Sequence, residues 1–169
     1  HKYKTGTKTV IKLGGSLKQA RKLQVTGVRP GAWGFAAMGT SPTVAKQLRS
    51  AFGKGLGIKK AGGCLTMALC MHGYGRMDPW IDHSLENVLH FIQAYLDQPS
   101  HQLPALAQIW ERLRDSLEEP YRWARVRGPM GSAVAILWDW GFVPTQIDLW
   151  TDPTGVVWSI DYATSPIDA

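Results

Sequence analysis

Three prolines stand at the start of apolar runs that repeat with helical spacing. Pro42 follows a Thr-Ser pair, Pro79 follows Asp78, and Pro129 follows a glycine. Proline has a fixed φ and no N–H to donate, so it suits the first turn of a helix and disrupts a helix interior. Ser, Thr and Asp are residues that cap helix N-termini. These positions therefore mark where helices begin, and they favour a mainly helical chain.

Apolar residues at intervals of three and four follow each of these starts. The sequence predicts helices over residues 42–52, 63–72, 79–97, 103–117 and 130–140, the last of which ends at Gly141. The helix over 63–72 is rich in Leu and Met, and we expect it to be buried. The helices over 79–97 and 103–117 are joined by a short loop that contains Pro99, so they should pack antiparallel.

The two ends of the chain have a different pattern. Residues 8–13 form a β-branched run, which predicts a short strand, and Ser16 can cap a cationic helix over 17–25. Near the C-terminus, two alternating runs flank the turn sequence at 152–155, which predicts a β-hairpin. The fold class is therefore mainly α, with five or six helices, a short N-terminal strand and a C-terminal β-hairpin.

The same pattern divides the chain into three segments. We expect a basic N-terminal arm over 1–25, a helical core over 26–142, and the hairpin with a tail over 143–169.

Charge is distributed very unevenly along the 169 residues. Residues 1–77 carry fourteen Lys and Arg and no acidic residue, whereas 78–169 carry five Lys and Arg against thirteen Asp and Glu. This asymmetry predicts a polyanionic partner for the first half, such as nucleic acid, an acidic protein surface or anionic lipid headgroups.

Three arginines interleave with aromatic residues in the segment YRWARVR at 121–127. Guanidinium groups can fork onto phosphates or stack on rings, and Tyr121 and Trp123 offer faces for stacking. The candidate phosphate contacts, in this segment and on the basic helices, are Lys18, Arg21, Lys22, Lys46, Arg49, Arg122, Arg125 and Arg127.

We find no pattern typical of a complete active site. Two-metal catalysis needs clustered carboxylates, a P-loop needs a specific glycine spacing, and structural zinc needs paired short spacings of Cys and His; none of these is present. We therefore expect no catalytic residues, no metal and no cofactor.

No apolar run approaches the ~20 residues of a spanning helix. Cys64 and Cys70 on one helix would lie too far apart for a disulfide, which favours reduced thiols and an intracellular location.

A short segment, VIKLGGSL at 10–17, resembles the first strand and phosphate-binding glycine loop of the amino-acid kinase family. The resemblance would assign phosphate binding to Lys12, Gly14, Gly15 and Ser16. It covers about eight residues, and the downstream motifs of that family are missing. A phosphotransferase fragment is therefore the third of the functions considered.

Three longer pieces are similar in order and spacing to one protein family. They are TGVRPGAWGFAAMGTSPTVAKQLRSAFGKGLG at 26–57, GCLTMALCMHG at 63–73 and YRWARVRGPMGSAVAILWDWGF at 121–142. Together they resemble the region that follows the polymerase palm in reverse transcriptases of non-LTR (LINE-type) retrotransposons, particularly the copies found in dinoflagellates. The resemblance implies a helical thumb or connection region that holds a template-primer duplex by its backbone. The fingers and the palm with its Tyr-x-Asp-Asp carboxylates are missing, so no polymerase activity is implied.

The leading expectation is thus a non-catalytic, basic, reverse-transcriptase-like connection domain that binds nucleic acid through phosphates. The alternative is a retroelement-derived structural subunit of a large assembly, such as an organellar ribosome or a membrane complex, which would dock through some of its eight tryptophans. The first function implies a nuclear location, and the second an organelle.

Overall fold

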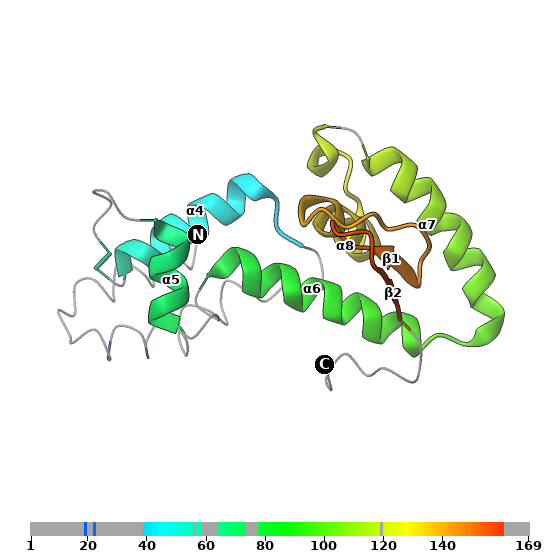
Figure 1. Ribbon diagram of the computed structural model, residues 1–169, viewed down its shortest axis with the longest axis horizontal. Helices are drawn as coiled ribbons and strands as arrows, with labels where there is room; N and C mark the ends of the chain where they lie inside the picture. Colours follow the sequence, from blue (N-terminus) through cyan, green and yellow to red (C-terminus); the bar gives the residue numbers. More distant parts are fainter. Residues whose placement is uncertain are drawn as a thin grey trace. The chain divides into compact units, whose positions relative to one another are not determined.

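The computed structural model describes Gln19, Lys22 and residues 39–55, 57–58, 64–73, 78–118 and 120–160. The predicted strand over 8–13, the kinase-like loop and most of the predicted helix over 17–25 lie outside these residues, although Gln19 and Lys22 are helical. The elements in chain order are α4 (Pro42–Gly55), α5 (Leu65–Gly73), α6 (Pro79–Leu96), η3 (Ser100–Gln102), α7 (Leu103–Leu117), η4 (Arg122–Ala124), α8 (Gly128–Asp139), β1 (Leu149–Thr151) and β2 (Val157–Ser159). The mainly helical fold with a C-terminal hairpin is confirmed (Figure 1).

The chain divides into two compact units. The structure describes Gln19, Lys22 and parts of residues 40–83 in the first unit, and Gly39, 84–118 and 120–160 in the second. Because the division falls inside α6, the first turns of this helix belong to the first unit and the rest to the second.

The first unit is built around α4. This helix begins at Pro42, as predicted, and buries Ala45, Leu48 and Phe52, which are spaced three and four apart. It packs against α5 and continues to Gly55, three residues beyond the predicted end at residue 52.

The expectation that the helix over 63–72 is buried is wrong. In α5, Leu69 is buried, but Met67 and Met71 are 61% and 77% exposed. A nine-residue helix has room for only a narrow contact face; α5 packs against α4, where the Leu65 side chain lies against Gly53.

Trp110 of α7 lies at the centre of the second unit. It is fully buried, its ring stacks on Phe91 of α6 at 5.0 Å, and a near-parallel Trp150 of β1 lies 6.4 Å away. Its indole N–H donates to the carbonyl oxygen of Pro144 at 3.2 Å. One side chain therefore connects two helices, the hairpin and the loop before it.

The two long helices contact each other through Phe91 and Trp110, but their backbones are not closely packed along their length. From the turn that joins them, α6 and α7 diverge, and α8 lies between them (Figure 1). Every residue from Gly131 to Leu137 in α8 is buried. An apolar helix of this kind favours a position inside the unit, so the simple antiparallel pair that was expected is opened by a third helix.

The ends of α8 are closely defined. At the C-terminus, Gly141 has φ +82°, and the N–H of Phe142 donates to the carbonyl oxygen of Leu137 at 2.9 Å, as in a Schellman motif. The predicted stop at Gly141 is confirmed. Near the N-terminus of α8, Ser132 lies close to Gly39. A Cβ on Gly39 would be 2.5 Å from the Cβ of Ser132, so only glycine at position 39 allows this close approach.

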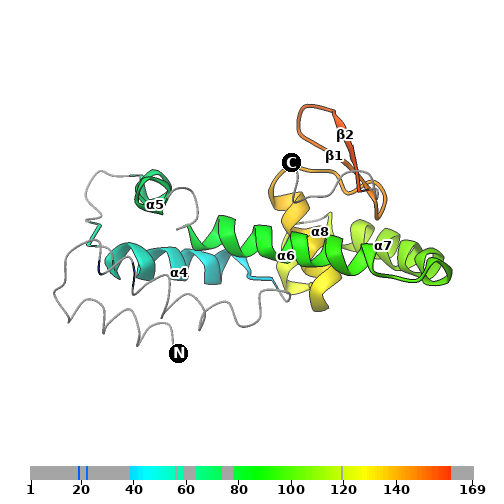
Figure 2. The same cartoon turned by 90° about the horizontal axis from the view of Figure 1, so that it is seen from below.

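The hairpin pairs β1 with β2 antiparallel, with Trp150 opposite Trp158, and it projects from the helices (Figure 2). Asp152 holds its turn. One carboxylate oxygen accepts the N–H groups of Thr154 at 2.8 Å and Val156 at 3.0 Å and the Thr154 hydroxyl at 2.6 Å; the other accepts the indole N–H of Trp158 at 3.0 Å. These donors, the Thr154 hydroxyl first and then the Trp158 indole, lower the pKa of Asp152 to about 2.

This arrangement predicts an acid-sensitive hairpin. Because the folded-state pKa of Asp152 lies below its unfolded value of about 3.9, the stabilisation is complete above pH ~4 and is lost as the pH falls through about 2. The indole proton resonance of Trp158 should therefore shift with a midpoint near pH 2 in an NMR titration. Asp152→Asn should remove this transition, and a midpoint near the ordinary value of Asp would contradict the assignment.

Candidate functional site

The segment at 121–127 forms the short η4 turn and the approach to α8. Arg122 donates from Nη1 to Oδ1 of Asp139 at 3.0 Å and from Nη2 to the carbonyl oxygen of Glu118 at 3.3 Å. Trp123 donates its indole N–H to the other oxygen of Asp139 at 2.7 Å. The Arg122 guanidinium also lies 5.8 Å from the ring centre of Trp138. Arg122 therefore fastens η4 to the end of α8.

Arg125 and Arg127 are more accessible. Both residues are exposed; Arg125 donates to the carbonyl oxygen of Ser116 at 3.0 Å, and Arg127 donates to those of Val126 at 2.9 Å and Ala124 at 3.2 Å. These hydrogen bonds orient the two guanidinium groups, and both residues are exposed to solvent.

Arg49 has a structural partner that the sequence pattern did not indicate. Its Nη2 lies 2.9 Å from Oδ2 of Asp78, whose side chain is 1% exposed, and it also donates to the hydroxyl of Thr66. The other oxygen of Asp78 accepts the N–H of Trp80 at 3.0 Å and caps α6, as the Asp-Pro signal predicted. Arg49 thus connects α4, α5 and the start of α6.

The remaining candidate contacts are lysines and one arginine of the first half. Lys46 of α4 and Lys22 are exposed, and Lys18 and Arg21 lie outside the described residues. The structure adds Lys54, an exposed residue in the last turn of α4 that the sequence analysis did not select. Lys54 lies on α4 because the helix extends beyond residue 52.

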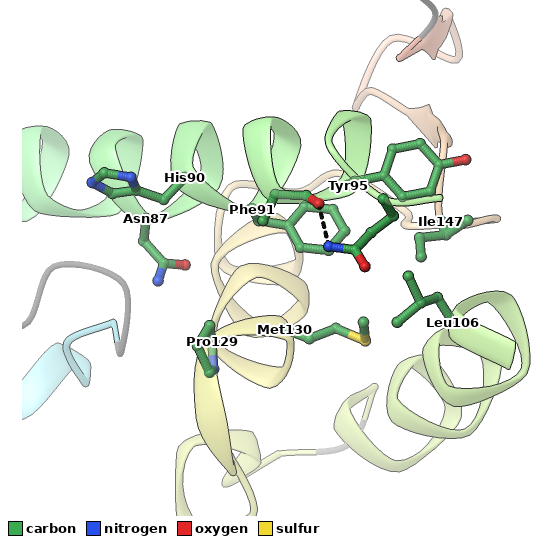
Figure 3. A pocket seen from close by; sticks show the side chains of 10 residues that line it. Asn87, His90, Phe91, Tyr95, Leu106, Pro129, Met130 and Ile147 are labelled. Carbon is green, nitrogen blue, oxygen red and sulfur yellow. Dashed lines mark hydrogen bonds between the residues drawn. The ribbon is translucent and has the colours of Figure 1, made fainter. Parts of the chain in front are cut away.

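A cavity of about 490 Å³ lies in the second unit. In Figure 3, Met130 of α8 extends between Phe91 of α6 and Leu106 of α7. The cavity is lined by Asn87, His90, Phe91, Ala94, Tyr95, Gln98, Leu106, Pro129, Met130 and Ile147. Its size is typical of small-molecule pockets. These lining residues include no Asp, Glu, Lys or Arg, so the cavity does not suit a phosphate group.

Cys64 is an exposed free thiol. The N–H groups at the start of α5, first that of Met67 and then that of Thr66, lower the pKa of this thiol.

Within the described residues, no three His, Cys, Asp or Glu side chains are grouped so that they could hold a metal ion. Among the described helices, none is both long and apolar enough to cross a membrane.

Comparison of the chain with protein-family models, with curated proteins and with solved structures found no match. The resemblance to the reverse-transcriptase region therefore stays a prediction from the sequence.

Proposed function

We propose that the chain is a non-catalytic nucleic-acid-binding domain, as expected for a reverse-transcriptase-like connection region, and that it binds through phosphate contacts. The supporting observation is how the first unit arranges its charges. Its two described carboxylates, Asp78 and Asp82, are buried at 0% and 7% exposure, whereas Lys46 and Lys54 are exposed. These two acidic groups are withdrawn from the surface and these two lysines remain on it, which favours a polyanion.

The candidate contacts differ in how far they are exposed and in whether an ion pair holds them. Lys46 and Lys54 in the first unit, and Arg125 and Arg127 in the second, are exposed cations that can approach phosphates. Arg49 and Arg122 are ion-paired and act mainly by holding helices together. Contacts of lysine and arginine with phosphates give a salt-dependent affinity with no base readout.

Salt-dependent binding is the test of this proposal. In filter binding with duplex DNA and with an RNA–DNA hybrid, we expect the logarithm of the association constant to fall linearly with the logarithm of salt concentration. Lys46→Gln should reduce the slope by about one and the affinity at ~0.1 M salt by about five- to tenfold, because one counterion release is lost.

Arg112→Gln is the matched control. Arg112 is also an exposed cation on a helix, but it lies on α7 in the acidic half of the chain. The control should change the affinity less than twofold. Binding that is absent, that is indifferent to salt, or that weakens equally in both variants would contradict the proposal.

One observation favours the alternative of a structural subunit. Val156, just before β2, and Val157 and Trp158 of β2 are 52%, 59% and 56% exposed. Adjacent exposed apolar side chains are typical of a docking surface. If the protein purifies in a stoichiometric protein complex that survives nuclease treatment and is lost in Trp158→Ser, this alternative replaces the first.

A further inference from the structure

Tyr121 has an unusual backbone conformation. Its φ of 68° and ψ of 21° place it in the left-handed region, and it is the only non-glycine residue with positive φ among those that the structure describes. This conformation brings Cβ close to a backbone carbonyl oxygen, so it is a genuine outlier for a bulky side chain. Glycine or asparagine would adopt it with less strain.

The tyrosine ring adds little to the packing of the fold. Tyr121 is 88% exposed, so its ring contributes almost no burial. Strained residues of this kind persist where the surrounding structure imposes them, and they concentrate at sites of function. A large, exposed, nearly uncovered aromatic face is therefore the feature of this position that a ligand could use.

The surroundings of Tyr121 indicate the chemistry of that ligand. The segment 120–128 contains three arginines, and Glu118 and Glu119 precede it. Asp139 pairs with Arg122, whereas Arg125 and Arg127 are exposed. Tyr121 caps the η4 turn, since its carbonyl oxygen accepts the N–H of Ala124 at 2.9 Å, and Arg125 follows directly. An aromatic face and exposed guanidinium groups thus occur together on a fixed turn.

We propose that Tyr121 is a stacking platform for an unpaired nucleobase, with Arg125 and Arg127 contacting the flanking phosphates, so that this segment prefers single-stranded nucleic acid. This inference rests on the proposed function and narrows its substrate. An aromatic side chain beside cationic ones is the combination by which single strands are held without sequence preference. In a duplex, the base faces are already stacked on each other, and the ring has no open face to cover.

The experiment is fluorescence anisotropy at one salt concentration with a labelled 12-nucleotide oligo(dT) and with a 12-base-pair duplex. Tyr121→Asn and Tyr121→Ala should each weaken binding of the single strand by about five- to hundredfold and change duplex binding less than twofold. Tyr121→Phe keeps the ring and should bind like the parent. Thermal unfolding is measured in parallel, and Tyr121→Asn should be as stable as the parent or more stable, because asparagine tolerates the left-handed conformation.

Weaker binding together with retained stability supports a role for the ring in the ligand site, since a merely structural tyrosine would not give this combination. If the parent protein binds single strand and duplex with equal affinity, and Tyr121→Asn changes neither affinity, the stacking inference is overturned while the proposed function stands. If neither nucleic acid binds the parent protein, the proposed function fails and the inference fails with it.

Discussion

Trp110→Ala is expected to lower the free energy of unfolding of the second unit by about 3–5 kcal/mol, the usual effect of deleting a large aromatic core side chain. Trp110 is completely buried and stacks on Phe91 at 5.0 Å, with Trp150 6.4 Å away. Deletion leaves a cavity where α6, α7 and the hairpin meet. Urea unfolding followed by circular dichroism measures the loss, and the same change should reduce the dispersion of the aromatic NMR resonances.

Two further variants separate the contributions to this effect. Trp110→Phe keeps an aromatic ring but removes the donor to the carbonyl oxygen of Pro144, so it should cost about 1–3 kcal/mol. Ile109→Ala is the matched control, because this neighbour on the same helix is 47% exposed and should cost less than about 1 kcal/mol. Equal losses for Trp110→Ala and Ile109→Ala would show that Trp110 is not central to the core.

The helices could be predicted from the sequence because their limits depend on local chemistry. The starts at Pro42 and Pro79 and the stop at Gly141 follow from a fixed φ, a capping carboxylate and a left-handed glycine, each of which acts within a few residues. The hairpin is likewise defined by its own turn, where Asp152 accepts donors no more than six residues away.

Packing between helices could not be predicted in the same way. The apolar pattern of α5 indicated burial, yet Met67 and Met71 are exposed, because a pattern does not say how much neighbouring surface is available to cover it. The packing of α8 against α7 likewise joins distant parts of the chain, and Trp110 donates to Pro144, thirty-four positions away.

The arginines of the candidate site show the same limit of prediction from sequence. Sequence reasoning treated Arg49, Arg122, Arg125 and Arg127 alike, because composition does not reveal the partners of a charge. Arg122 reaches Asp139, seventeen residues away, through a bond that only the folded turn allows. The structure therefore separates cations that fasten helices from cations that remain exposed, and binding measurements on Arg125 and Arg127 are more informative than those on Arg122.

Asp78→Ala is expected to destabilise the first unit by about 3 kcal/mol. Loss of the cap on the N–H of Trp80 contributes about 1 kcal/mol. Loss of the charge-assisted contact with Arg49 contributes roughly 2 kcal/mol, a value below that of a fully buried pair because the Arg49 side chain is 25% exposed. Asp78→Asn can keep the cap through its carbonyl oxygen and should lose only the second part. Hydrogen exchange at the first turns of α6 and at α4 measures both effects.

A double-mutant cycle with Arg49→Gln then decides which role Arg49 has. If Arg49 is the partner of Asp78, the losses of Arg49→Gln and Asp78→Asn will not add, and the cycle will give a coupling energy of about 1–2 kcal/mol. Arg49→Gln would then affect nucleic-acid binding only as far as it loosens the unit. If the two losses add and Arg49→Gln instead weakens binding at unchanged stability, Arg49 belongs with Lys46 as a phosphate contact, and its pairing with Asp78 is not what holds α4 to α6.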